Sequence, residues 1–216
     1  MAYVRGKGFL MLKRWLKPLT FVLSLAPLSW CLYQVFLLSQ GQPHLLGADP
    51  GKSIVDFNGQ WALRFLILTL MVTPIKQLFS LPLVAQVRRM LGLFAFFYAT
   101  IHLASYVVFL LELRFSDILA DVIKRPYITV GISAFSMLTL MAVTSNRWMI
   151  SRLGAWWKRL HKLIYVISVL VIVHLTWLTK SEYQEAFLYG LVIAVLLVIR
   201  VARLGWITRR NTVDGK

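Results

Sequence analysis

Six long apolar segments constrain the fold of this chain more than any other feature of its sequence. They span residues 18–38, 61–79, 90–111, 126–145, 160–179 and 186–199. A helix needs about 20 apolar residues to cross a bilayer, and each segment approaches that length. Of the 216 residues 59% are hydrophobic, and a soluble domain of this size has too little interior to bury them. We therefore predict an all-α protein with one domain, residues 1–216, built as a membrane bundle of six transmembrane helices.

Basic residues are distributed unequally between the turns that join these segments. Eighteen of the 24 Lys and Arg residues fall in the N-terminal tail, the second turn, the fourth turn and the C-terminal tail. An excess of Lys and Arg marks the cytoplasmic side of a membrane protein, so we expect both termini in the cytoplasm. The net charge of +16 is then a collar at the membrane surface, and we expect no nucleic-acid partner. The first segment is too long for a signal peptide, and we interpret it as an anchor.

Several kinds of site are excluded by the residues that the chain lacks. Cys31 is its only cysteine, which excludes a disulfide framework, a Cys-ligated iron–sulfur cluster and thioether-bound haem. No glycine-rich dinucleotide motif or phosphate-binding loop is present, so we expect no soluble nucleotide-binding domain.

Histidines lie inside two of the apolar segments. His102 lies in segment 90–111, and His174 lies in segment 160–179. Counted along ideal helices, they stand about 18 and 21 Å above the cytoplasmic ends of these segments, so both fall in the outer half of the bilayer. An imidazole in a membrane span indicates a functional site, and haem iron accepts imidazoles from two helices. We predict that His102 and His174 are the axial ligands of a haem held without thioether bonds; the alternative is two hydrogen-bonded structural histidines.

His161 begins the fifth segment, roughly 20 Å deeper than His174. Thirteen residues turn an ideal helix by about 220°, so the two histidines share no face unless that helix is bent or bulged. On the third segment the same depth is occupied by Arg88 or Arg89. His161 is therefore either a ligand at a second, inner haem or an interfacial histidine beside Trp156 and Trp157, and the number of haems is one or two.

Other polar residues have two interpretations each. Arg64, near the outer end of the second segment, either pairs with a haem propionate or extends to the outer headgroups. Arg88 and Arg89 suit a propionate, a flavin phosphate or lipid headgroups, and we favour lipid. We expect His44, in an outer loop, to be solvated and without a partner.

Seven sequence blocks carry a family resemblance. They are LGADP (46–50), NGQWALRFL (58–66), TP (73–74), RRMLGLFAFFYATIHLASY (88–106), RPYITVG (125–131), LGAWWKRLHKLIYV (153–166) and HLTW (174–177). These blocks resemble the MsrQ family, the haem-binding membrane subunits of bacterial periplasmic methionine-sulfoxide reductase systems. That family belongs to the ferric-reductase-like transmembrane group. The resemblance covers residues 46–178 and is most specific around His102 and between residues 153 and 177.

The resemblance implies a multi-pass protein of the bacterial inner membrane that carries electrons. It implies b-type haem held by His102, His161 and His174, a flavin mononucleotide (FMN), and electrons drawn from the quinone pool or a cytoplasmic flavin reductase. The electrons would pass to a periplasmic molybdopterin partner, MsrP, which repairs methionine sulfoxide in proteins. Related NADPH oxidases and ferric reductases have two histidines on each of two helices, and this chain lacks one of the four. No flavin-binding residue can be assigned.

Two other functions compete with a non-catalytic electron-transfer subunit. One is a self-sufficient transmembrane haem reductase of the ferric type, but such enzymes usually carry their own flavin and nicotinamide domain. The other is a transporter whose histidines relay protons. Neither an inverted repeat nor a pair of broken helices is evident in the sequence, so we rank the transporter last.

Overall fold

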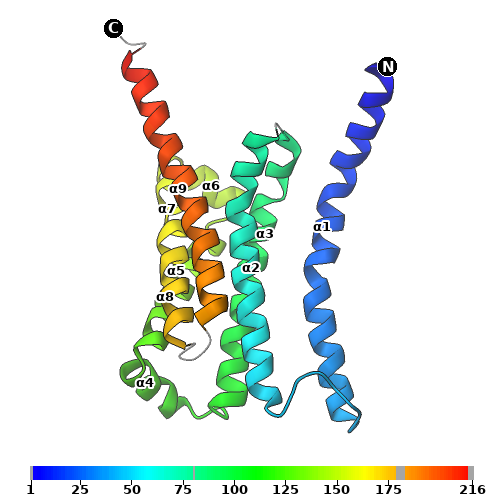
Figure 1. Cartoon of the computed structure of the whole chain (residues 1–216), viewed down its shortest axis with the longest axis vertical. Helices are drawn as coiled ribbons and strands as arrows, with labels where there is room; N and C mark the ends of the chain where they lie inside the picture. The colour runs from blue at the N-terminus through cyan, green and yellow to red at the C-terminus, as the bar shows by residue number, and fades with distance from the viewer. Residues whose placement is uncertain (1, 80, 179–182, 214–216) are drawn as a thin grey trace. The chain divides into compact units, whose positions relative to one another are not determined.

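The structure, a computed structural model, is helical throughout the part of the chain it describes. It describes the backbone of residues 2–79, 81–178 and 183–213, and the side chains of residues 14–79, 81–114, 117–118, 120–178 and 184–200. The elements are α1 (Ala2–Ser39), α2 (Pro50–Leu78), the 3₁₀-helix η1 (Pro82–Gln86), α3 (Arg88–Ser105), the π-helix η2 (Tyr106–Leu110), α4 (Phe115–Lys124), α5 (Pro126–Val143), α6 (Arg147–Leu153), α7 (Ala155–Leu160), α8 (Leu163–Leu178) and α9 (Tyr183–Val213) (Figure 1).

Five helical stretches among the described residues are long and apolar enough to cross a membrane. They are Arg14–Ser39, Pro50–Leu78, Arg88–Leu110, Pro126–Val143 and Ala155–Leu178. The all-α fold and the multi-pass class are therefore confirmed, with five of the six expected segments recovered. The sixth segment, residues 186–199, lies within α9, and a sixth span and the cytoplasmic termini stay predictions.

The second helix begins much earlier than its apolar segment. We expected a start at Trp61, but α2 starts at Pro50. The backbone N–H of Lys52 donates to Oδ1 of Asp49 at 3.0 Å, so Asp49 caps the helix and Pro50 takes its first position. Charged and polar residues in the first turns hid this part from a hydropathy analysis, because helical hydrogen bonds do not require apolar side chains.

Two further features were not expected from the apolar segments. Helix α4 forms between the third and fourth apolar segments, in residues that were interpreted only as a connection, and its ten residues are too short to span a membrane. The fifth segment is also interrupted, since α7 ends at Leu160 and α8 begins at Leu163. The break falls at His161, the second residue of the predicted segment 160–179, so the regular helix that carries His174 begins only at Leu163.

The chain divides into two compact units, each of which is described by itself. One unit comprises Met1–Thr69 and Leu81–Ala120, and the other comprises Leu70–Ser80 and Asp121–Lys216. Helix α2 therefore contributes its first part to one unit and its end to the other.

In the first unit, Tyr98 joins α3 to α1. Its side chain is fully buried, and its hydroxyl donates to the carbonyl of Ser24 at 2.8 Å and accepts the N–H of Leu28 at 3.1 Å. These two backbone groups would bond to each other in a regular helix. Pro27 lies between them in sequence and has no N–H of its own to donate, so the tyrosine hydroxyl adds hydrogen bonds to the backbone of α1 beside a proline.

In the second unit, α8 packs between α5 and α9, and Arg200 of α9 bonds to the end of α2. Its Nη2 donates to the carbonyl of Leu70 at 3.0 Å and to Oγ1 of Thr73 at 2.9 Å, and its Nη1 donates to the hydroxyl of Tyr165 at 3.2 Å. Pro74 has no N–H to give to the Leu70 carbonyl four residues before it. Arg200 therefore supplies the hydrogen bond that Pro74 removes.

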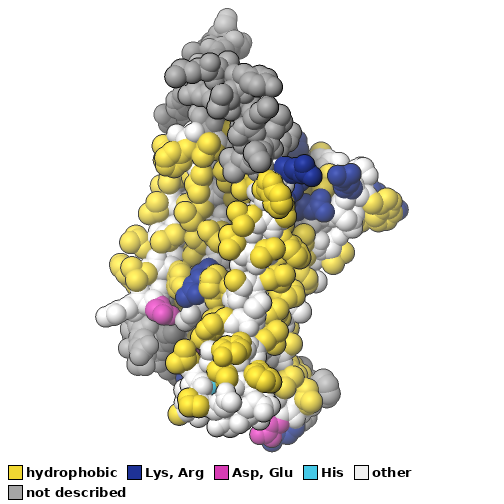
Figure 2. Space-filling model, turned by 90° about the vertical axis from the view of Figure 1, so that its right-hand side faces the viewer, with side chains coloured by type: hydrophobic (Ala, Val, Ile, Leu, Met, Phe, Trp, Pro, Cys, Tyr) yellow, Lys and Arg dark blue, Asp and Glu magenta, His cyan; other side chains and the backbone are white. Residues whose placement is uncertain are grey.

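Exposed side chains on the helices are largely apolar. Hydrophobic side chains cover most of the face drawn in Figure 2. Large exposed examples occur on α1, at Phe21 and Leu23, and on α9, at Phe187 and Val198. In water such a surface would be costly, whereas lipid tails solvate it, so the surface agrees with the membrane class.

Candidate functional site

His102 lies in the last turn of α3 and is half-buried against α2. Its Nδ1 is 2.8 Å from the carbonyl oxygen of Val55. A carbonyl only accepts hydrogen bonds, so the imidazole is the donor, through Nδ1–H.

The ring of His102 can approach this carbonyl because residue 59 is glycine. A Cβ placed at position 59 would lie 2.8 Å from Nδ1 of His102 and 3.0 Å from its Cε1, which is closer than real Cβ contacts allow. In a helix the N–H of residue 59 bonds to the carbonyl of residue 55, so Gly59 lies directly beside the acceptor. The imidazole therefore rests on bare backbone of α2.

His174 has the same arrangement in the second unit. It is half-buried in α8, and its Nδ1–H donates to the carbonyl of Tyr127, at the start of α5, over 2.7 Å. A Cβ at position 131 would lie 2.9 Å from both Nδ1 and Cε1 of His174, so Gly131 gives the ring the same close approach to α5.

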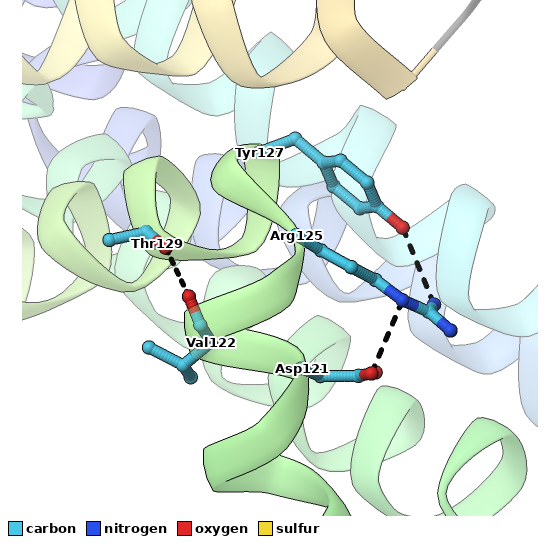
Figure 3. A network of polar contacts seen from close by, with 5 residues as sticks. All are labelled: Asp121, Val122, Arg125, Tyr127 and Thr129. Carbon is cyan, nitrogen blue, oxygen red and sulfur yellow. Dashed lines mark hydrogen bonds and ion pairs between the residues drawn. The ribbon is translucent and has the colours of Figure 1, made fainter.

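Polar contacts hold the turn that presents the Tyr127 carbonyl (Figure 3). Nε of Arg125 pairs with Oδ1 of Asp121 at 3.2 Å, and Nη1 of Arg125 donates to the hydroxyl of Tyr127 at 3.4 Å. The hydroxyl of Thr129 donates to the carbonyl of Val122, which ties α5 to the end of α4. The block RPYITVG (125–131) thus contains the carbonyl that accepts from His174, and its residues Arg125 and Thr129 bond this turn to α4.

This geometry suits two metal-ligating imidazoles. A neutral imidazole that donates through Nδ1–H carries its lone pair on Nε2, the atom that can bind a metal. Ligating histidines commonly give their other N–H to a backbone carbonyl, which fixes the tautomer and strengthens the ligand. The residues present therefore fit haem ligation through Nε2 of His102 and of His174.

His161 is held differently. It ends α7, and its Nε2 is 3.5 Å from Oγ1 of Thr144, a long contact. Its ring lies on that of Trp157, with centroids 4.0 Å apart, and Trp157 donates Nε1–H to the carbonyl of Thr144 at 3.0 Å. The expected neighbourhood of tryptophan is therefore confirmed for Trp157. Trp156 is exposed beneath Arg159 instead.

The remaining predicted residues are Arg64, Arg88 and Arg89. Arg64 is half-buried, with Nη2 donating to Gln60 at 3.2 Å and its guanidinium 4.8 Å over the Trp61 ring. On a regular helix Arg64 lies about 140° around α2 from Gly59. Arg88 and Arg89 are exposed at the start of α3.

One expectation about the outer loop is wrong. His44 is half-buried, and its Nδ1 accepts the backbone N–H of Leu46 at 3.3 Å, so this side chain has a partner. The bond closes a short turn because the two residues are only two positions apart.

The glycines and the carbonyls of Val55 and Tyr127 were missed in the sequence. The only available signal was that Gly59 and Gly131 each lie in a block that carried the resemblance. A glycine within a spanning helix indicates a close approach, but the sequence does not say of which group.

Comparison with known proteins identifies the class and then the family. The family described as ferric reductase like transmembrane component matches residues 58–172, more than half of the chain and including both glycines and two of the three membrane histidines. A protein of Xanthomonas euvesicatoria pv. vesicatoria (strain 85-10), named protein-methionine-sulfoxide reductase heme-binding subunit MsrQ, is 45% identical over 185 residues, 86% of this chain and 85% of the relative. A relative of the same name from Polaromonas naphthalenivorans (strain CJ2) is 40% identical over 203 residues, 93% and 90% of the two chains. The chain therefore belongs to the MsrQ family of the ferric-reductase-like transmembrane proteins, and the resemblance seen in the sequence is confirmed.

Proposed function

We propose that this chain binds b-type haem through Nε2 of His102 and His174 and carries electrons across the bacterial inner membrane to a periplasmic methionine-sulfoxide reductase. The observation that carries the proposal is that both imidazoles donate Nδ1–H to a backbone carbonyl. The names of the relatives, which call them heme-binding subunits, support the choice of ligand. Haem, when bound, supplies a one-electron carrier.

The protein's own residues orient and insulate this centre. The carbonyls of Val55 and Tyr127 hold the two rings in one tautomer, which spares each imidazole a rearrangement on binding iron. The helices that carry these histidines are mostly apolar and would limit the access of water to a bound haem, and solvent exposure is one of the factors that set a haem's reduction potential.

The cytoplasmic half of the route is assigned to His161. We place it at electron entry, either on a second haem or beside FMN, with the quinone pool or a cytoplasmic flavin reductase as donor. Its place at the start of the fifth apolar segment, beside a turn rich in Lys and Arg, supports this position. FMN itself rests on the family resemblance alone.

Arg64 is the proposed partner of a haem propionate. Gln60 and Trp61 orient its guanidinium, which is suited to a carboxylate. Because it lies well around α2 from Gly59, only its long side chain would bring it to the haem. Arg64→Gln should then weaken haem retention more than Arg64→Lys does, whereas equal retention in both would favour the headgroup role.

The electron acceptor on the periplasmic side is assigned to MsrP. This assignment requires both termini in the cytoplasm and six spans, with His102 and His174 nearer the periplasm. The unequal distribution of basic residues supports this orientation.

Haem quantitation tests the ligand assignment. Pyridine-haemochrome content and absorption spectra would be measured for the wild type, His102→Ala, His174→Ala and the control His44→Ala. Loss of one axial imidazole leaves iron five-coordinate and the haem labile, so both membrane variants should lose the outer haem while the control keeps it. A full low-spin spectrum in either variant would contradict the assignment.

Reoxidation kinetics test the partner. The reduced wild-type protein in detergent would be mixed with purified MsrP, with and without a methionine-sulfoxide peptide, and the haem absorbance followed by stopped flow. Fast reoxidation that requires both MsrP and the peptide supports the proposal. No acceleration with both present would overturn it.

A further inference from the structure

The two histidine sites are related by a constant shift along the chain. Each imidazole donates to a carbonyl 47 positions earlier, Val55 for His102 and Tyr127 for His174. Each is also approached by a glycine four positions after that carbonyl, Gly59 or Gly131. Residues 55, 59 and 102 of the first unit thus correspond to residues 127, 131 and 174 of the second, a shift of 72 positions.

The same shift relates other residues on the glycine-bearing faces. Ala62 corresponds to Ala134, and Leu66 corresponds to Leu138; three of these four side chains are buried. Positions 59, 62 and 66 lie on one face of a helix, as do positions 131, 134 and 138. After the histidines, Leu103 corresponds to Leu175. The correspondence therefore extends along the glycine-bearing faces of α2 and α5 and is not limited to the polar contacts.

The repeat differs at the cytoplasmic end. His161 corresponds to Arg89, which lies in the exposed start of α3. The second unit is interrupted at this level, between α7 and α8, whereas α3 runs on from Arg88 as one helix. Chain spacing between each glycine and its histidine is nevertheless the same, 43 positions in both units.

We propose that the pair α2 and α3 and the pair α5 and α8 are two copies of one histidine-presenting helix pair. In each copy a glycine, Gly59 or Gly131, is a positioning residue: it lets the imidazole donate Nδ1–H to the backbone carbonyl one helical turn before the glycine. The expected effects on haem retention and potential rest on the proposed haem function. The Nδ1–H tautomer of His102 and His174 does not, because it is set by backbone carbonyls of the protein.

A methyl group at either glycine would require the imidazole ring or the helix to move. A Cβ would lie 2.8–3.0 Å from ring atoms at position 59 and 2.9 Å from them at position 131, so the ring or the helix must shift. One edge of the ring is held by the carbonyl, and in the proposed function the opposite edge is held by iron. The shift therefore lengthens the Nδ1–H to carbonyl bond or the bond from Nε2. A weaker hydrogen bond from Nδ1–H makes Nε2 a weaker electron-pair donor to the iron, and this raises the reduction potential of the haem.

Glycine-to-alanine variants test the positioning role. Gly59→Ala and Gly131→Ala would be compared with Gly92→Ala in the first unit and Gly190→Ala in the second. A Cβ at position 92 would lie 3.7 Å from the nearest side-chain atom of Thr69, and a Cβ at position 190 would lie 3.5 Å from that of Ile172; both are ordinary van der Waals distances. We expect about 10–100-fold weaker haem retention for Gly59→Ala and Gly131→Ala, with an upward shift in midpoint potential of whatever haem remains. Both controls should keep wild-type haem content and potential.

A nitrogen NMR measurement on the haem-free full-length protein keeps the proposal testable if a variant fails to fold. With ¹⁵N-labelled histidine, the wild type should show two neutral imidazoles protonated at Nδ1, those of His102 and His174. His102→Ala and His174→Ala assign one signal each. Each folded glycine variant should alter the signal of its own histidine only.

The outcomes separate this proposal from the proposed function. Protonation of His102 and His174 at Nε2 in the wild type would overturn it. Unchanged haem content and potential in both Gly59→Ala and Gly131→Ala would overturn it as well. A wild type that binds no haem but shows two Nδ1-protonated histidines would refute the haem function and leave the histidine-presenting pairs supported.

Discussion

Replacing Arg200 with methionine removes the donor that satisfies the Leu70 carbonyl. The side chain is only 8% exposed, and its three acceptors, the Leu70 carbonyl, Thr73 Oγ1 and the Tyr165 hydroxyl, are all neutral. The hydroxyls of Thr73 and Tyr165 can rotate toward other partners. The Leu70 carbonyl cannot, because Pro74 has no N–H to give. One buried acceptor left without a donor costs about 1–3 kcal/mol of unfolding free energy.

A gain from removing the guanidinium opposes this cost, because Arg200 pairs with no carboxylate among the residues that the structure describes, and a buried charge held only by neutral groups is itself unfavourable. The single substitution therefore combines two opposing effects, and its coupling to Pro74 is the sharper quantity. Pro74→Ala restores an N–H opposite the Leu70 carbonyl. In the Arg200→Met background this bond replaces the lost one, whereas in the wild type the carbonyl already has a donor. We expect the stabilisation by Pro74→Ala to be about 1–2 kcal/mol larger in the Arg200→Met background.

The assay is a double-mutant cycle of unfolding free energies, measured by SDS titration in mixed micelles at one temperature. Arg152→Met, an exposed arginine beside Trp148, is the matched control and should change stability by no more than about 0.5 kcal/mol. Equal effects of Pro74→Ala in both backgrounds, within about 0.3 kcal/mol, would refute the link between Arg200 and the proline.

Three further predictions concern α1, electron entry and topology. Tyr98→Phe deletes the hydroxyl between Ser24 and Leu28 and should cost about 1–3 kcal/mol in the same unfolding assay; an unchanged stability would mean that the α1 ladder closes by itself. His161→Ala should slow reduction of the outer haem by the physiological donor in stopped flow while dithionite reduction stays complete, and equal rates would leave His161 a structural residue. Alkaline phosphatase fused after Lys216 should be inactive, and the same enzyme fused at residues 180–186, after the fifth apolar segment, should be active; the opposite result would reverse the topology.

The membrane class, the family and the membrane histidines were all readable from the sequence. Hydropathy is a property of consecutive residues, so apolar runs indicated the spanning segments without knowledge of their neighbours. The start of α2 was also encoded locally, because Asp49 and Pro50 form a cap and a first turn, but the charged residues after them concealed it from a hydropathy count.

Contacts between helices were decided by the tertiary structure. The approach of His102 to Val55 and of His174 to Tyr127 joins groups 47 positions apart, and the acceptors are backbone atoms, which have no signature in the residue types. In the sequence Arg200 looked like one member of a basic collar. In the structure it donates to the carbonyl of Leu70, 130 positions earlier, which has no helical donor because Pro74 lacks an N–H. The sequence by itself determined which segments are apolar and which side chains can bind iron. Packing decided which backbone carbonyls these side chains contact, because a buried hydrogen-bond donor needs an acceptor and the neighbouring helix determines which carbonyl is accessible.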